Sequence, residues 1–354
     1  MSNELMAAGV KMWATLFGAS FMTLATTESH LSYIAALQEM ARSALPRYGF
    51  SSNVQVALLS HSENTVFRLD NPKTGWRAVM RVHRANYQTA NAIQSELDWM
   101  TALNEAGIAT PQPLRTLDSE SLIEVETAAA GKRMIATFAW VDGDFPDEGN
   151  LPPSLQKLGE LSARMHRQSR QWQRPGYFER HTWSLDDTVG ESGRWGRWRD
   201  APWLGREQVN VLERARDLMS LRLESFGMSP DKYGLIHADL RLANLLIKGD
   251  RTTIIDFDDC GIGWFLHDMA TALSFIEHRP DRRELMLHWA DGYARHGALT
   301  QADIEEFPTF LMQRRLQLLA WMASHSETEL AQSLGERWVA DTAELATDYL
   351  HQMG

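Results

Sequence analysis

The spacing of apolar residues changes near residue 142, and this change sets the fold class. Before it, the chain carries short β-favouring runs bounded by turn residues, at 54–59, 64–69, 76–82, 121–127 and 133–141, with one helical run at 87–106. After it, apolar residues recur at helical spacing over 155–168, 207–226, 282–296, 304–324 and 329–350. The pattern predicts an α+β protein of two lobes, a small β-rich first lobe and a mainly helical second lobe.

The length agrees with two lobes, because 354 residues exceed the about 100 to 200 residues of one ordinary domain. We expect an N-terminal extension at 1–29, a first lobe at 30–141 and a second lobe at 142–354. One strand pair is expected to interrupt the helical lobe, with strands at 245–247 and 252–257.

Charge and cysteine content exclude several classes of protein. The net charge is −11, whereas a protein that binds a nucleic-acid backbone carries a basic surface, so nucleic acid is not an expected partner. The single cysteine, Cys260, permits no internal disulfide, and we expect it to be a packing residue. No Cys/His cluster has zinc spacing, and the cytoplasm is the expected compartment.

The stretch 6–25 is fairly apolar, but Lys11 interrupts it and its length is at the low end of what a bilayer requires. We expect a loose extension that does not anchor the chain in a membrane, with Met22 as a second candidate start. A signal peptide stays open as the alternative.

Three oxygen-bearing side chains meet around the strand pair of the second lobe. A turn centred near Asp250 predicts that Asn244 and Asp256 are cross-strand neighbours, close enough to share a hard cation such as Mg²⁺. Asp239 precedes Asn244 by five residues and is placed to reach a substrate near that cation. Each Asp taken alone could instead be a turn former or a helix cap.

These residues carry a resemblance to a known family. The stretch 237–244, His-Ala-Asp-Leu-Arg-Leu-Ala-Asn, followed by 255–259, Ile-Asp-Phe-Asp-Asp, resembles the catalytic and metal loops of the aminoglycoside phosphotransferase and choline kinase-like family. That family has a protein-kinase-like fold. The first lobe looks most similar to the homoserine kinase type II and bacterial stress-response kinase branch, and the resemblance covers about residues 30–350.

The resemblance implies a role for each residue of the second lobe. Asp239 would accept the proton of the substrate hydroxyl, and Asn244 and Asp256 would hold Mg²⁺ against the phosphates of ATP. Arg241 matches a position that faces the transferring phosphoryl group, with an ordinary surface Arg as the alternative. His237 and Asp268 are expected to brace the loop.

In the first lobe the resemblance implies a nucleotide site. Arg81 would bind the α- and β-phosphates, where many relatives carry Lys, and Glu96 would pair with Arg81 from the neighbouring helix. A solvent-facing Glu96 is the alternative. The remaining expected contacts come from the turn that replaces a glycine-rich loop and from the interlobe segment whose backbone would meet adenine: Ser62 and Asn64, and Ala139 and Val141.

Two further features of the sequence each allow more than one interpretation. Asp258 and Asp259 could bind a second metal ion or a cationic substrate, or form a solvated turn. A Trp-rich segment follows the first helix of the second lobe; it could be a substrate lid or partner surface, or an insertion that packs its own rings. Its tryptophans are Trp172, Trp183, Trp195, Trp198 and Trp203.

The expected function is ATP- and Mg²⁺-dependent transfer of the γ-phosphate to a hydroxyl of a small molecule, such as an amino alcohol, amino acid, amino sugar or antibiotic. A cationic acceptor would suit the charge of −11. A protein Ser/Thr kinase of the stress-response type is one alternative. A catalytically silent nucleotide-binding module is another, although such a module has no need of Asp239.

Overall fold

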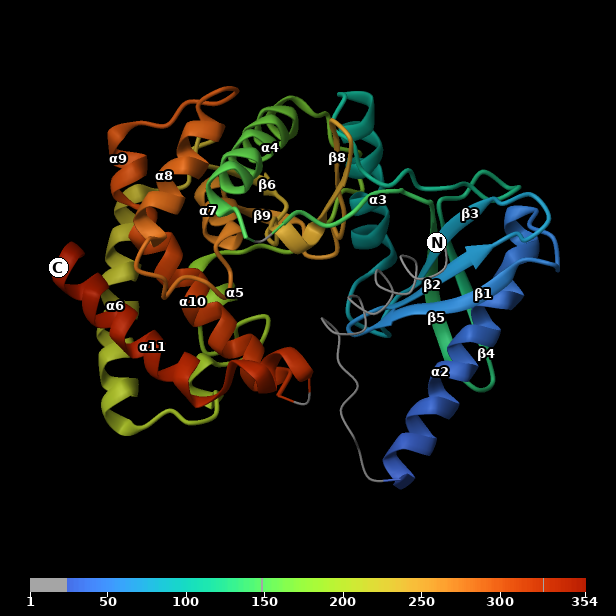
Figure 1. Cartoon of the computed structure of the whole chain (residues 1–354), viewed down its shortest axis with the longest axis horizontal. Coiled ribbons are helices and arrows are strands. Elements are labelled where there is room, and N and C mark those ends of the chain that lie inside the picture. The colour runs from blue at the N-terminus through green and yellow to red at the C-terminus, as the bar shows by residue number, and fades with distance from the viewer. Residues whose placement is uncertain (1–23, 148, 327) are drawn as a thin grey trace. The chain divides into compact units, whose positions relative to one another are not determined.

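The computed structural model describes residues 24–147, 149–326 and 328–354, and these residues form two compact units (Figure 1). The first unit holds the described residues up to 105 together with 109–142 and 175–179, and the second holds 106–108, 143–174 and 180–354. The expectation for the stretch 6–25 lies almost wholly outside the described residues. None of the described helices combines the length and apolarity needed to span a bilayer.

An antiparallel five-stranded sheet forms the first unit, in the order β1-β2-β3-β5-β4 (Figure 1). Its strands are β1 (Gln55–His61), β2 (Thr65–Asp70), β3 (Arg77–Val82), β4 (Leu122–Thr127) and β5 (Gly131–Ala139). All five strands were predicted, to within two residues at each end. The expected helix is α3 (Ala90–Glu105), whose apolar positions at helical spacing are buried.

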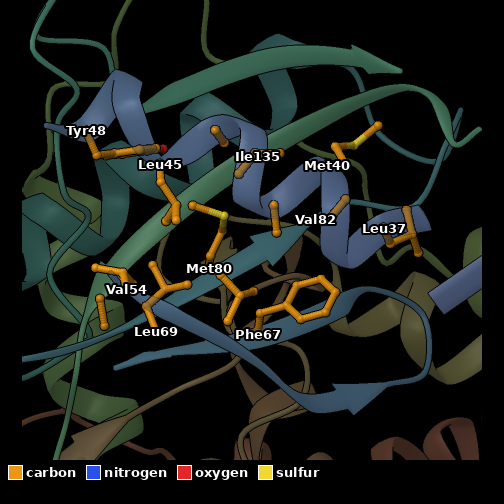
Figure 2. Close-up of a cluster of buried hydrophobic side chains, with 14 of the residues drawn as sticks. Leu37, Met40, Leu45, Tyr48, Val54, Phe67, Leu69, Met80, Val82 and Ile135 are labelled. Carbon is orange, nitrogen blue, oxygen red and sulfur yellow. The ribbon is translucent and has the colours of Figure 1, made fainter. Parts of the chain in front are cut away.

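A helix that the sequence analysis did not predict completes this unit. Helix α2 (Leu24–Ala44) leads into a short 3₁₀ turn, η1 (Leu45–Tyr48), and both contribute to the core of the sheet. Figure 2 shows Leu37 and Met40 of α2 facing the same cluster as Phe67 of β2 and Met80 of β3. Residues 24–29, expected in the extension, therefore belong to the start of a helix that closes the core.

The second unit is mainly helical, as predicted. Its helices are α4 (Leu151–Gln171), α5 (Leu185–Val189), α6 (Arg206–Phe226), α7 (Phe265–Ala272), α8 (Arg282–Tyr293), α9 (Gln301–Glu305), α10 (Phe307–Ser324) and α11 (Glu329–Met353). The single helix expected at 304–324 is divided, because Glu306 separates α9 from α10 and Pro308 occupies the first turn of α10. A non-helical Gly335 kinks α11.

The expectation of one strand pair in the second lobe was wrong. Besides β7 (Leu245–Lys248) and β8 (Arg251–Ile254), the structure has an antiparallel pair of β6 (Tyr233–Ile236) and β9 (Gly261–Trp264). Neither strand of this second pair was predicted, and Gly261-Ile262-Gly263-Trp264 of β9 lacks the β-branched alternation that marks a strand. Strand β8 ends at Ile254, three residues earlier than expected.

Two glycines let helices α4 and α8 approach to backbone contact. A Cβ atom added to Gly159 of α4 would lie 1.9 Å from the carbonyl oxygen of Trp289, and one added to Gly292 of α8 would lie 1.8 Å from that of Gln156. Both distances are far inside van der Waals contact, and the colliding atoms are backbone atoms that cannot rotate away.

We therefore expect Gly292→Ala to force α4 and α8 apart and to lower the free energy of unfolding by at least about 2 kcal/mol, the scale of core overpacking. Urea unfolding followed by circular dichroism measures this. Gly176→Ala is the matched control: nothing lies within 4 Å of its added Cβ. It should leave stability within about 0.5 kcal/mol. Equal effects of the two substitutions would contradict the close helix contact.

Candidate active site

A buried carboxylate shapes the loop that follows β6. The Asp268 side chain, from α7, accepts hydrogen bonds from the backbone N–H groups of His237 (3.2 Å) and Ala238 (2.8 Å), and from Nε2 of His166 at 2.8 Å. Ala238 has a φ of 65°, a left-handed conformation that residues other than glycine rarely adopt. The predicted bracing role of Asp268 is confirmed, because its carboxylate holds the backbone at this strained position.

His237 ties the same loop to the end of β8. Its Nδ1 accepts from the N–H of Asp239 at 3.3 Å, so its proton resides on Nε2, which donates to the carbonyl oxygen of Ile255 at 3.2 Å. The ring packs on Phe257 with centroids 4.6 Å apart. The prediction that His237 braces the loop is thus confirmed, and the residue next to Asp256 is held through it.

The Asp239 carboxylate lies among three donors. Its Oδ1 accepts from an Nη of Arg314 at 2.7 Å, and its Oδ2 accepts from Nδ2 of Asn244 at 2.8 Å and from Nε of Arg241 at 3.3 Å. Burial by itself raises the pKa of the Asp239 carboxyl, but the positive charges of Arg241 and Arg314 outweigh it and hold that pKa below its usual range. The carboxylate is therefore ionised.

Arg314 is the functional residue that the sequence analysis missed. It lies on α10, 75 residues after Asp239, and its side chain is 2% exposed. The one signal in the sequence is the presence of polar and charged residues inside an otherwise apolar helix, at Gln313, Arg314, Arg315 and Gln317. That pattern shows that the residues need partners but does not say which partners they find.

The register of the β7–β8 hairpin differs from the prediction by one residue. The turn consists of Gly249 and Asp250, so Lys248 pairs with Arg251, and Leu245 pairs with Ile254. The N–H of Ile255 then donates to the carbonyl oxygen of Asn244 at 2.9 Å. Asn244 therefore lies opposite Ile255 rather than opposite Asp256. The reason is the centre of the turn, which lies between Gly249 and Asp250 rather than on Asp250 and so shifts each pairing by one residue.

Asp256 follows immediately, and its backbone also adopts a left-handed conformation, with a φ of 63°. Asn244 is 4% exposed, while Asp256 is exposed. Nδ2 of Asn244 donates both to the backbone oxygen and to Oδ2 of Asp239, at 2.8 Å each, so the amide oxygen is the atom left to act as a ligand. The structure thus places Asn244 directly against Asp239, and Asp256 one residue beyond the ladder position that faces Asn244.

This donor set fits a hard divalent cation held partly by phosphates. Magnesium is bound in kinases by one or two protein oxygens, with substrate phosphates and water supplying the rest of the octahedron. Among the described residues no group of three or more His, Cys, Asp or Glu side chains is placed to hold a metal alone. An amide oxygen and one carboxylate therefore match a metal that arrives with a nucleotide.

The Trp-rich segment fixes the chain after Asp256. Arg180 donates to the backbone oxygens of Asp258 and Cys260, and Nε1 of Trp183 donates to the backbone oxygen of Asp259 at 2.8 Å. Of the Trp-rich segment, Trp183, Trp195 and Trp198 are buried, whereas Trp203 is 49% exposed. These burials favour the packing alternative over a mobile lid, and Cys260 is buried as expected.

The first unit contains the expected pair of charges. An Nη of Arg81 on β3 donates to Oε1 of Glu96 on α3 at 2.6 Å, and the two side chains are 9% and 0% exposed. The solvent-facing alternative for Glu96 is wrong. The Arg81 guanidinium also lies over the ring of Phe138, 5.2 Å from its centroid. A buried carboxylate that loses its partner is costly, so the pair acts as one unit.

The turn between β1 and β2 is closed by its own backbone, since the N–H of Ser62 donates to the carbonyl oxygen of Asn64 at 3.2 Å. Oδ1 of Asn64 accepts from the N–H of Arg84 at 3.0 Å. Its Nδ2 is therefore the group that could meet a phosphate.

At the end of β5, the N–H of Ala139 donates to the carbonyl oxygen of Gln112 at 2.9 Å. Ala139 can accordingly offer a nucleotide base only its carbonyl oxygen. Of these two expected residues, only Val141 could offer a backbone donor to adenine.

Comparison with known proteins shows the family of the chain. The pattern of the phosphotransferase enzyme family matches residues 55–307. The chain therefore belongs to that family. It is an ATP-dependent phosphotransferase that acts on a hydroxyl of a small molecule and uses a divalent metal. The predicted family, kinase-like fold and class of reaction are confirmed, and the silent-module alternative is set aside.

Three relatives illustrate the match. A solved microcompartment-associated aminopropanol kinase is 39% identical, with a TM-score of 0.82, over 89% of this chain and 98% of that chain. The amicoumacin kinase of Bacillus subtilis (strain 168) is 25% identical over 290 residues, which are 79% of this chain and 82% of that protein. A solved amicoumacin kinase, hAmiN with AMP-PNP, Ca²⁺ and Ami, is similar in fold, with 23% identity, a TM-score of 0.72, and coverage of 91% and 95%.

The Arg81–Glu96 contact generates a double-mutant prediction. Arg81→Ala and Glu96→Ala should each raise the apparent KM for ATP, and the double variant should be little worse than either single one. Contacting residues couple by about 0.5 to 3 kcal/mol, whereas independent sites add. Steady-state kinetics with varied ATP measures the cycle.

The matched control is the exposed pair of Lys132 and Glu124, which are 2.7 Å apart and 60% and 49% exposed. Alanine at either position should leave the KM for ATP unchanged. Strictly additive effects of the Arg81 and Glu96 substitutions would show that the two residues act separately.

Proposed function

We propose that this chain phosphorylates the hydroxyl of a small cationic amino alcohol, with Mg²⁺ as the metal and ATP as the donor. The observation that carries the proposal is the Asp239 carboxylate with Asn244 bonded to it, in a chain 39% identical to an aminopropanol kinase over nearly its full length. The charge of −11 supports a cationic acceptor. In this proposal the lobe at 30–141 binds the nucleotide, and the lobe at 142–354 carries the metal and acceptor sites.

The reaction needs positioning more than covalent chemistry. The acceptor oxygen bonds to the γ-phosphorus, the bond from that phosphorus to the bridging oxygen of ADP breaks, and the hydroxyl proton passes to Asp239. Arg241 is bonded to Asp239 through Nε at 3.3 Å, and its side chain is 26% exposed. Its Nη groups can therefore face the charge that develops on the transferring group while Nε stays on Asp239.

We assign the nucleotide contacts from the charge of each residue and from the hydrogen-bond donors that it offers. Arg81, held by Glu96, would bind the α- and β-phosphates. The turn at Ser62 and Asn64 would offer donors to the phosphates, and the adenine edge would meet the carbonyl oxygen of Ala139 and the N–H of Val141.

Asn244, through its amide oxygen, and Asp256, through its carboxylate, would hold Mg²⁺. The metal would neutralise phosphate charge during transfer. The left-handed backbone conformation of Asp256 supports this assignment. Backbone strain of that kind persists where a functional site requires a side chain to point in one direction.

A panel of acceptors tests the acceptor class. ADP release should be fastest with 1-amino-2-propanol or ethanolamine. The kcat/KM should fall about ten- to a hundredfold with 2-propanol, which lacks the ammonium, since a hydrogen bond to a charged group is worth about 1.5 to 3 kcal/mol.

Asp239→Asn should lower phosphoryl transfer to every acceptor by about 10²-fold or more. Equal rates with 2-propanol and the amine would reject the cationic acceptor, and full activity of the Asn variant would reject the role of Asp239.

Removal of one ligand tests the metal site. Asp256→Ala should weaken binding of MgATP far more than binding of ATP in the presence of EDTA, because the metal links the carboxylate to the phosphates. Asp250→Ala, in the turn of the same hairpin, is the matched control and should change neither. Isothermal titration gives both affinities, and equal weakening of the two forms would make Asp256 a structural residue.

A further inference from the structure

The carboxylate of Asp239 has one oxygen already saturated. Each carboxylate oxygen offers two lone pairs. Oδ2 accepts from Asn244 and from Arg241, which uses both. Oδ1 accepts from Arg314 alone among the residues that the structure describes. The lone pair left for a substrate hydroxyl is therefore on Oδ1, the oxygen that Arg314 holds.

The Arg314 guanidinium is fixed at all three of its nitrogens. Besides the bond to Asp239, Nε donates to Oγ of Ser274 at 2.9 Å, and Nη1 donates to Oε1 of Gln317 at 3.2 Å. The Trp195 ring lies against the guanidinium, 5.3 Å from its centroid to Cζ. A planar guanidinium that is bonded at three nitrogens and stacked on one face cannot turn, so the direction of the N–H that it donates to Asp239 is fixed.

We infer that Arg314 is a positioning residue for phosphoryl transfer, which fixes the Asp239 carboxylate so that Oδ1 receives the proton of the acceptor hydroxyl. The inference rests on the proposed role of Asp239. It also gives the Trp-rich segment a function: Trp195 holds the outer face of the arginine that orients the base. The acceptor then approaches Asp239 from the Oδ1 side, next to Arg314 rather than next to Asn244.

The arrangement suits the chemistry. In a loose phosphoryl-transfer transition state the nucleophile loses its proton late, so alignment of the hydroxyl matters more than the basicity of its acceptor. A carboxylate that accepts the hydroxyl hydrogen along one fixed direction supplies that alignment. A misplacement of about 1 Å can cost about 10²-fold in rate.

The neighbouring residue offers a matched control. Arg315 is also fully buried on α10, but it pairs with Glu277 at 2.8 Å and donates to Thr342 and to the backbone oxygen of Trp338. None of these partners belongs to the catalytic loop. Changes at Arg315 therefore report the cost of losing a buried arginine without loss of the contact to Asp239.

The test compares Arg314→Met with Arg315→Met, each assayed with MgATP and 1-amino-2-propanol. For Arg314→Met we expect kcat to fall by about 10²-fold while the KM for ATP stays within about twofold. Arg314→Lys should recover part of kcat, and added guanidinium ion should partly restore the activity of Arg314→Ala.

The control Arg315→Met should lower the thermal midpoint but keep kcat per folded molecule. Ser274→Ala, which removes one tether of Arg314, should lower kcat by a smaller factor and leave the fold intact.

Normal kcat in folded Arg314→Met would overturn the inference, as would a loss equal to that of Arg315→Met at matched folded fraction. If Arg314→Met does not fold, the kcat values of Ser274→Ala and Arg314→Lys test the inference instead. An unchanged kcat in both variants overturns the inference. Asp239→Asn separates this inference from the proposed function: an active Asn variant removes the role of Asp239, whereas an inactive Asn variant with an active Arg314→Met removes only the role of Arg314.

Discussion

The buried carboxylate of Asp268 is the interaction on which the second unit depends. It accepts hydrogen bonds from two consecutive backbone N–H groups, those of His237 and Ala238, which water would otherwise bind. The hydrogen bond from His166 offsets part of the free-energy cost of burying the carboxylate. Without these bonds the left-handed Ala238 has no compensation for a conformation that costs of order 1 to 3 kcal/mol. The loop from β6 to β7 then has its direction set before any substrate arrives.

From this loop the chemistry is assembled by short contacts. His237 links it to the end of β8, and Asn244 donates to the Asp239 carboxylate. The chain after Asp256 is held from the other side by Arg180 and Trp183. Hydrogen bonds thus hold both the loop that carries Asp239 and the chain after Asp256. Support of this kind keeps side chains in place with the precision that in-line transfer requires.

The parts predicted from sequence are those encoded locally. Asp239 and Asn244 lie in one loop, and Asp256 follows the adjoining hairpin, so their spacing together with the family resemblance indicated the candidate site. The resemblance also predicted the pairing of Glu96 with Arg81, which the structure shows. The hairpin register was wrong by one residue because turn type decides it, and Gly249-Asp250 forms a two-residue turn. Arg314 and helix α2 could not be predicted, since each acquires its role only from tertiary contacts with residues far away in the chain.

Helix α10 carries two buried arginines in succession that serve different neighbours. Arg314 faces the Asp239 loop, whereas Arg315 faces Glu277 and α11. Successive residues of a helix differ by about 100° in direction, so a single inserted or deleted residue before Arg314 would turn each arginine away from its partner. The length of α10 up to this point is therefore a constraint on how such chains can diverge. Substitutions can accumulate around it, but changes of length must fall in the loops at its ends.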